Sequence, residues 1–255
     1  MGAAPSVNLA SETEMTEDPT HTAAGGPGAR APLTRERIVE AAVRLMDEEG
    51  LAAVTMRRVG RAVGVEAMSL YHHVRDKDDL LDGVVDHVMR GFPFPAEPGP
   101  SSEDLAAYGR AVAHAWRRTL RAHPAVVELL ARRGRSARSA ALLRPVEVAL
   151  WTLRRMGLSP PDAARAFHVI GSYVMGSVVL ETGRISAAEG GGGATGHDLP
   201  PDAFPQVLEA LSYLDADDPD ERFDFGLDLM IEAIRTLAGR SREPERDVGT
   251  SNATR

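Results

Sequence analysis

The 255-residue chain has no cysteine, and aromatic residues make up only 5% of it. The first absence excludes disulfides, thiolate metal sites and a cysteine nucleophile. Uninterrupted runs of eighteen apolar residues are also absent, so we expect no membrane span. The first twenty residues are partly acidic and have neither a basic start nor an apolar stretch, so we expect no secretory signal and a cytoplasmic protein.

Motifs typical of catalysis are missing as well. The sequence holds no GxSxG, HExxH or P-loop pattern and no paired carboxylates with supporting structure, so we expect no enzyme. We likewise expect no metal and no cofactor.

Charge is unevenly distributed along the chain. The formal net charge is −8, yet the segment 55–77 holds five basic and two acidic side chains, and two histidines besides. A basic segment on an acidic body is typical of a protein that meets phosphate with one small face, although a solvated helix face produces the same pattern.

Apolar residues recur at helical spacing, and no segment alternates as a strand does, so the sequence predicts an all-α fold. Residues 1–32 and 240–255 have too few large apolar groups to order themselves and are expected to be flexible tails. A Pro/Gly-rich break at 91–102 separates two helical regions. The expected helices are 34–49, 56–63, 66–73, 77–90, 102–123, 124–132, 139–156, 160–181, 205–214 and 220–238.

The segment 55–77 has the pattern of a helix-turn-helix. Thr55 is placed to cap a first helix, Gly64 permits a sharp turn, and a short second helix from Glu66 to His73 follows. A helix fits the major groove of DNA, and its first residues reach the base edges. A corner between two packed helices of a bundle is the alternative.

Residues 34–90 resemble the N-terminal domain of the tetracycline-repressor (TetR) family. The resemblance is carried by Gly50 before Thr55-Met56-Arg57, by Ala62-x-Gly64-Val65, by Leu70-Tyr71-x-His73-Val74, and by Lys77 before Leu80-Leu81. It implies contacts to the base edges by Arg57, Ala67, Met68, Ser69 and Tyr71, and contacts to phosphates by Thr55, His72, His73 and Lys77. Ala67 stands where the tetracycline repressors have glutamine, so we expect a different operator.

Residues 104–238 are similar to the C-terminal domain of the same family, through His123-Pro124, the run 154–159 and Gly171-Ser-Tyr-Val-Met-Gly176. The resemblance implies a three-helix DNA-binding domain at 33–80 and a ligand-binding and dimerisation domain at 81–239. It also implies a four-helix bundle between two copies, for which Leu227, Met230, Ile231 and Ile234 would supply the apolar stripe. Burial of these residues in the core of a single chain is the alternative.

The resemblance further implies a double-stranded palindromic operator and a small-molecule effector as partners. The candidate effector-binding residues are Tyr108, Val112, Trp116, Leu130, Val146, Leu150, Trp151, Phe167, His168 and Ser172. Leu130 stands where the tetracycline repressors have a magnesium-ligating histidine, and Val112 replaces an asparagine. A larger, more apolar effector than magnesium–tetracycline is therefore expected.

Only the resemblance indicates that the protein represses transcription rather than activating it. The residues leave open a ligand-dependent activator of the same fold, or a helical scaffold that binds no DNA.

Overall fold

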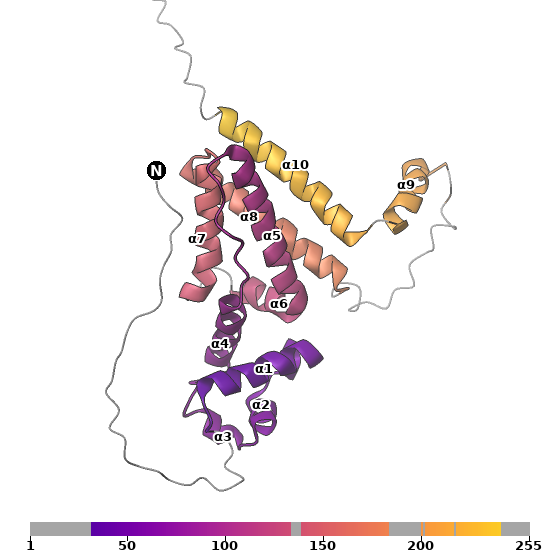
Figure 1. Cartoon of the computed structure of the whole chain (residues 1–255). Helices are drawn as coiled ribbons and strands as arrows, with labels where there is room; N and C mark the ends of the chain where they lie inside the picture. The colour runs from indigo at the N-terminus through magenta and orange to yellow at the C-terminus, as the bar shows by residue number, and fades with distance from the viewer. Residues whose placement is uncertain (1–31, 134–138, 184–199, 201, 217, 241–255) are drawn as a thin grey trace, which may run out of the picture. The chain divides into compact units, whose positions relative to one another are not determined.

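The computed structural model describes residues 32–133, 139–183, 200, 202–216 and 218–240. All regular structure in these residues is helical, with ten α-helices and one short 3₁₀ helix (Figure 1). The expected all-α fold is confirmed. Apart from residues 32 and 240, the two predicted tails lie outside the described residues.

The chain divides into two compact units. The first contains Met1–Gly91 and Arg133–Leu142, and the second contains Phe92–Arg132 and Leu143–Arg255. All of the helix at 77–90 therefore clusters with the N-terminal helices. The division at residue 80 into DNA-binding and effector-binding domains stays a prediction about function.

The first unit is built from α1 (Arg35–Glu49), the 3₁₀ helix η1 (Leu51–Ala53), α2 (Met56–Val63), α3 (Ala67–Leu70) and α4 (Lys77–Arg90). The predicted N-caps are confirmed: Thr34, Thr55 and Asp76 each accept a hydrogen bond from a backbone N–H in the first turn of the following helix. Such caps satisfy backbone donors that have no partner inside the helix.

The core of this unit lies where α1 packs against α2 and α4. Each of α1, α2, α3 and α4 contributes side chains that are almost entirely buried, and the largest of them are Ile38, Met46, Val59, Leu70, Leu80 and Met89. Burial of such side chains contributes about 1.5–3 kcal/mol each, which is enough to hold helices as short as α3 in place.

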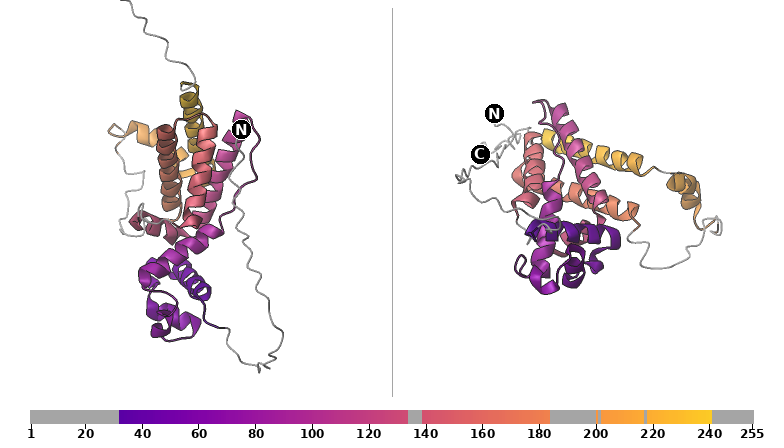
Figure 2. Two further views of the ribbon diagram at one scale, coloured as in Figure 1. Left: turned by 90° about the vertical axis from the view of Figure 1, so that its left-hand side faces the viewer. Right: turned by 60° about the horizontal axis from the view of Figure 1, so that its bottom comes forward.

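The second unit contains α5 (Ser102–Ala122), α8 (Pro160–Glu181), α9 (Pro205–Ala216) and α10 (Pro219–Arg240), together with most of α6 (Pro124–Arg133) and of α7 (Ala140–Arg155). In this unit α5 lies beside α7 and α8, and α10 packs on α8 (Figures 1 and 2). The cap of α5 is Ser101, which forms a capping box with Asp104. The predicted cap of α8, Ser159, is confirmed.

The α8–α10 contact is close at Gly226, because a Cβ atom there would overlap the ring of Tyr173. Tyr173 stacks on Phe223 with ring centroids 5.4 Å apart, and its hydroxyl lies 3.1 Å from the carbonyl oxygens of both Arg222 and Phe223. A glycine is thus required at the crossing point of the two helices.

The predicted apolar stripe of α10 was wrong in its detail. Leu227, Ile231 and Ile234 are at most 7% exposed within a single chain, since they form the side of α10 that packs on its own unit. The apolar side chains that α10 exposes are instead Phe225 and Leu229, at 67% and 59%. Periodicity located the buried face of the helix but not the element that buries it.

Helix α8 is long and apolar enough to cross a membrane by length and composition, with a mean hydropathy of 1.3, and only 17% of its apolar window is buried. Val169 and Leu180 are exposed at 57% and 68%. An apolar, exposed helix of this kind needs a further partner surface to be stable in water.

Candidate DNA-binding surface and effector site

The corner between α2 and α3 has the geometry of a helix-turn-helix. Gly64 adopts a left-handed conformation (φ 81°, ψ 31°), and the Val65 N–H donates to the carbonyl of Gly60 at 2.9 Å. A Cβ atom at Gly60 would lie 2.9 Å from the Val65 oxygen, so the turn folds directly onto the glycine. Two glycines therefore fix the angle at which α3 leaves α2.

Helix α3 is shorter than expected. Its α-helical residues end at Leu70, and residues 71–73 continue as a turn in which His73 and Val74 both donate to the Leu70 carbonyl at 2.9 Å. Leu70 is fully buried and anchors the element. Met68 and Tyr71, by contrast, are 74% and 45% exposed.

None of the predicted DNA-binding residues in this corner is buried. Arg57, His72, Lys77 and Thr55 are exposed, and Ala67, Ser69 and His73 are half-buried. The hydroxyl of Thr55 already caps α2 by accepting from the Arg58 N–H at 3.3 Å. Arg58 itself is held by Glu49, which raises the arginine pKa through a hydrogen bond.

Four of the ten predicted effector-binding residues come together in one aromatic cluster of the second unit. Tyr108 and Val112 on α5 are buried, and Trp116 and Trp151 pack against them. Trp151 meets Tyr108 edge-on with centroids 6.4 Å apart. Burial raises the pKa of the Tyr108 hydroxyl, which keeps it neutral.

Sequence reasoning missed further members of this cluster, namely Phe92, Ala115 and Val148. Phe92 lies within the Pro/Gly-rich break at 91–102 rather than in a helix, so no periodicity points to it. Its ring lies 6.0 Å from Trp116 and 4.7 Å from Phe94.

The other predicted effector-binding residues lie elsewhere. Leu130, Val146, Leu150 and Phe167 are half-buried, and His168 and Ser172 face solvent on α8. Their role in effector binding stays a prediction.

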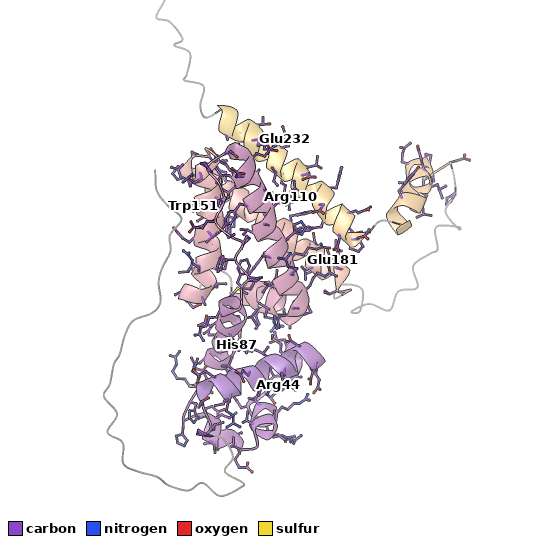
Figure 3. All side chains as sticks on the ribbon, viewed as in Figure 1. Arg44, His87, Arg110, Trp151, Glu181 and Glu232 are labelled. Carbon is purple, nitrogen blue, oxygen red and sulfur yellow. The ribbon has the colours of Figure 1, made fainter. Side chains whose placement is uncertain are left out.

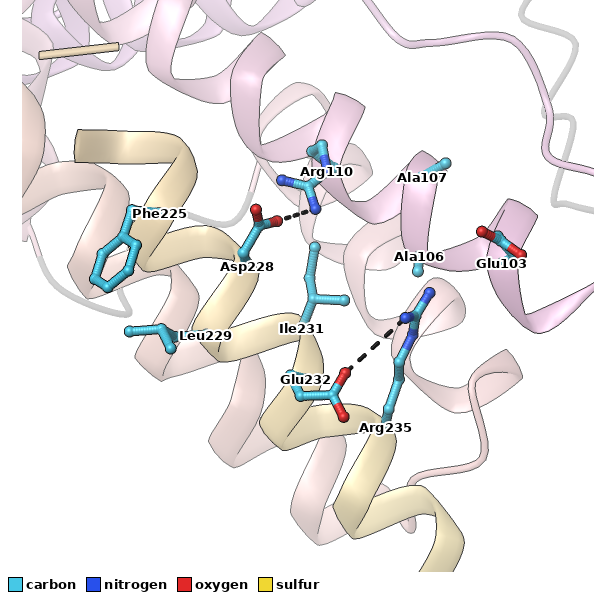
Figure 4. A pocket seen from close by; sticks show the side chains of 10 residues that line it. All are labelled: Glu103, Ala106, Ala107, Arg110, Phe225, Asp228, Leu229, Ile231, Glu232 and Arg235. Carbon is cyan, nitrogen blue, oxygen red and sulfur yellow. Dashed lines mark hydrogen bonds and ion pairs between the residues drawn. The ribbon is translucent and has the colours of Figure 1, made fainter. Parts of the chain in front are cut away.

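A surface groove of about 500 Å³ lies between α5 and α10 (Figure 4). It contains none of the predicted effector-binding residues, and its walls carry charged side chains such as Arg110, Asp228 and Glu232. Arg110 and Asp228 form an ion pair across it. The groove is open to solvent, and its walls also carry apolar side chains such as Phe225, Leu229 and Ile231.

A buried arginine joins α5, α8 and α10. The Arg117 side chain is only 4% exposed, and it pairs with Glu181 at 2.9 Å and with Asp220 at 2.7 Å. It also donates to the Pro219 carbonyl at 2.9 Å and lies over the Phe223 ring at 4.5 Å. Burial alone would lower the pKa of Arg117, but the two carboxylates outweigh that effect and raise it.

Glu181, at the end of α8, is therefore occupied inside its own chain. Its side chain is 6% exposed, and its carboxylate is held by Arg117 and approached by Arg121 at 3.6 Å (Figure 3). No local pattern predicts this pair, because 64 residues separate its members.

Among the described residues, no group of three or more histidine and acidic side chains is arranged to hold a metal ion. The aromatic cluster offers a single hydroxyl, that of Tyr108, and no carboxylate.

The described residues form helices only, with a helix-turn-helix in the first unit, and this arrangement is typical of DNA-binding regulators. Comparison with known proteins agrees. Residues 38–84 match the model of bacterial regulatory proteins of the tetR family, and residues 97–238 match the tetracyclin repressor-like C-terminal domain. The chain belongs to the TetR family and is a ligand-responsive transcriptional repressor.

Curated relatives are similar over most of their length. The HTH-type transcriptional repressor DrrR1 of Streptomyces coeruleorubidus is 31% identical over 84% of this chain and 82% of its own. The tetracycline repressor protein class D of Escherichia coli is 28% identical over 80% of this chain and 90% of its own. Both names describe repressors, in agreement with a regulator rather than an enzyme.

Solved structures agree in fold. Apo ActR from Streptomyces coelicolor superposes with a TM-score of 0.70 at 27% identity, covering 84% of this chain and all of ActR. ActR in complex with actinorhodin superposes with a TM-score of 0.68 at 29% identity, covering 82% of this chain and all of ActR.

Proposed function

We propose that this protein is a cytoplasmic dimeric repressor that binds a palindromic operator through α2 and α3 and is released by a largely apolar, aromatic effector. The observation that carries the proposal is the paired arrangement of an exposed α3 surface in the first unit and a buried aromatic cluster in the second. A helical scaffold needs a buried core but has no need of the exposed α3 surface.

The DNA-binding part of this proposal is supported by the exposure and the charge of residues in and next to α2 and α3. Met68 and Tyr71 extend into solvent beside Leu70, which is buried, so the side chains that would contact DNA are separate from those that hold α3. Arg57 would pair with a guanine edge, and Lys77 with a backbone phosphate. Met68 would lie against a thymine methyl group.

The dimeric half rests on the exposed apolar residues of α8 and α10. Val169 and Leu180 on α8 and Phe225 and Leu229 on α10 are 57% to 68% exposed. A second copy covering this face would form a two-fold interface, and two binding heads one DNA turn apart would then require a palindromic operator.

The effector half rests on the chemistry of the aromatic cluster. Phe92, Tyr108, Trp116 and Trp151 offer ring faces and one hydroxyl. Such a lining suits a flat, aromatic molecule with few polar groups. The Streptomyces coelicolor relative whose structure contains actinorhodin makes that compound a suitable probe.

A gel shift with a palindromic fragment from the protein's own upstream region tests the DNA-binding half. Arg57→Ala is expected to cost about 1–3 kcal/mol, which weakens binding roughly 5- to 150-fold, and Tyr71→Ala is expected to abolish the shifted band. Tyr213→Ala is the matched control, because Tyr213 is 76% exposed on α9. Unchanged binding in both Arg57 and Tyr71 variants would refute this assignment.

Intrinsic fluorescence tests the effector half, because both tryptophans of the chain belong to the aromatic cluster. Actinorhodin is expected to quench the emission, and Trp116→Ala is expected to weaken effector-induced release from DNA while leaving operator affinity in effector-free protein unchanged. Equal loss of both properties would show that Trp116 only supports the core.

A further inference from the structure

The side chain of Arg35, the first residue of α1, binds both His73 and Asp79. One guanidinium nitrogen donates to the His73 carbonyl at 3.1 Å and to the Asp79 carboxylate at 2.9 Å. The other donates to the second carboxylate oxygen at 3.0 Å and to the Asp79 carbonyl at 3.2 Å. A planar guanidinium makes this two-pronged contact, whereas an ammonium group does not.

The contact spans the connection between the DNA-contacting turn and α4. His73 ends the turn that follows α3, and Asp79 lies in the first turn of α4. The same carboxylate accepts from the Arg75 N–H at 2.9 Å. The start of α1, the segment that holds Arg75 and the start of α4 therefore meet at one carboxylate. The Asp79 side chain that carries it is only 12% exposed.

The crossing of α1 and α4 is close enough for this contact only because of a glycine. A Cβ atom at Gly83 would lie 2.8 Å from a methyl carbon of Val39, whose side chain is buried, and 3.5 Å from Arg35. Gly83 and Val39 lie one helical turn beyond Asp79 and Arg35, respectively. Bulk at position 83 would push the helices apart just where Arg35 and Asp79 meet.

We propose that Arg35 and Asp79 form a clamp that positions the DNA-contacting turn, so that they determine operator affinity without touching DNA. This inference rests on the proposed DNA-binding function. The clamp fixes the carbonyl end of the turn carrying Tyr71 and His73 relative to the start of α4, where Lys77 lies. The distance between the side chains of the turn and Lys77 is then constant, so base and phosphate contacts form together.

The clamp predicts a difference between specific and non-specific binding. Base contacts depend on the exact placement of Tyr71, whereas phosphate attraction depends mainly on the number of positive charges. Arg35→Lys keeps the charge and loses the two-pronged geometry. It should therefore weaken binding to the operator and leave binding to unrelated DNA almost unchanged.

The test uses the full chain with Arg35→Lys, Gly83→Ala and the control Arg44→Lys, since Arg44 is exposed on the same helix (Figure 3). Operator affinity is compared with affinity for an unrelated duplex at one salt concentration, and amide hydrogen exchange is followed over 70–76 in DNA-free protein. For Arg35→Lys and Gly83→Ala we expect operator affinity to fall about tenfold or more, equivalent to about 1.4 kcal/mol.

Exchange over 70–76 should rise in both variants, with unrelated-duplex affinity within about twofold of the unaltered protein. Alanine is the better helix former by about 1 kcal/mol, so a loss in Gly83→Ala would come from the displaced helix rather than from weakened helicity. Arg44→Lys should change neither quantity.

Two results would overturn the clamp: operator affinity within twofold of the unaltered protein in Arg35→Lys, or operator and unrelated-duplex affinity falling together. Failure of the unaltered protein to distinguish any operator from unrelated DNA would instead refute the proposed function. In that case the exchange measurement alone decides whether Arg35 positions residues 70–76, and unchanged exchange refutes it.

Discussion

Replacing Arg117 by alanine should destabilise the second unit more than any surface change. The substitution leaves Glu181 buried, with its side chain 6% exposed and its partner at 2.9 Å removed. Breaking one side of a buried ion pair costs about 3–5 kcal/mol, because the remaining charge loses its main partner. Arg121, whose side chain is 48% exposed and lies 3.6 Å from the other carboxylate oxygen, compensates that charge only in part. Asp220 adds little, since its side chain is 68% exposed and its pair with Arg117 is screened by water.

Thermal unfolding at one protein concentration measures this loss. For a unit of this size, about 3–5 kcal/mol lowers Tm by roughly 6–20 °C. The double variant Arg117→Met/Glu181→Leu is the sharper test, because replacing a whole buried pair by apolar side chains of similar volume is often neutral or stabilising. We therefore expect the double variant to melt close to the unaltered protein.

A double variant as unstable as Arg117→Ala would refute the claim that the Glu181 carboxylate causes the destabilisation. The destabilisation would then come from lost packing of the arginine stem on Phe223, over which the guanidinium lies at 4.5 Å, and not from the stranded carboxylate. A Tm drop of less than about 3 °C in Arg117→Ala would refute it as well.

Three further outcomes are expected. Gly226→Ala should lower the free energy of unfolding by about 1–3 kcal/mol in urea, since the new methyl group overlaps the Tyr173 ring; an unchanged midpoint would show that the ring moves freely. Hydrogen bonding from Arg35 holds the pKa of Asp79 well below its usual range, so Asp79 stabilises the first unit above about pH 4 and loses that effect as the pH falls. Circular dichroism between pH 5 and 2 should show less acid sensitivity in Asp79→Asn, and an identical acid profile would contradict the assignment. Phe225→Glu combined with Leu229→Glu should shift the protein toward monomer in analytical ultracentrifugation, whereas an unaffected dimer would place the interface elsewhere.

Local signals allowed most of the helices to be predicted. Thr34, Thr55 and Ser159 cap the helices expected of them, and α2 spans the predicted residues. A short polar side chain just before a helix caps backbone N–H groups within one turn. The start of the helix can therefore be predicted from the sequence alone. Helix α3 ended early because its last turn bonds back to a single carbonyl, that of Leu70, a detail that no periodicity encodes.

The candidate site was less predictable, because its members are distant in sequence. Tyr108 and Trp151 meet across two helices, and Phe92 joins them from a segment without regular structure. Ion pairs such as Arg117 with Glu181 leave no local trace, and the orientation of α10 depends on what packs against it. Such contacts are set by tertiary packing, which a pattern along one segment does not contain.

The small size of α3 has an evolutionary consequence. Leu70 alone is buried among its four helical residues, so mutations at Ala67, Met68 or Ser69 alter the outward surface with little cost to folding. Under the proposed DNA-binding role, substitutions at these three codons would give descendants of this protein new target genes and leave the second unit unchanged.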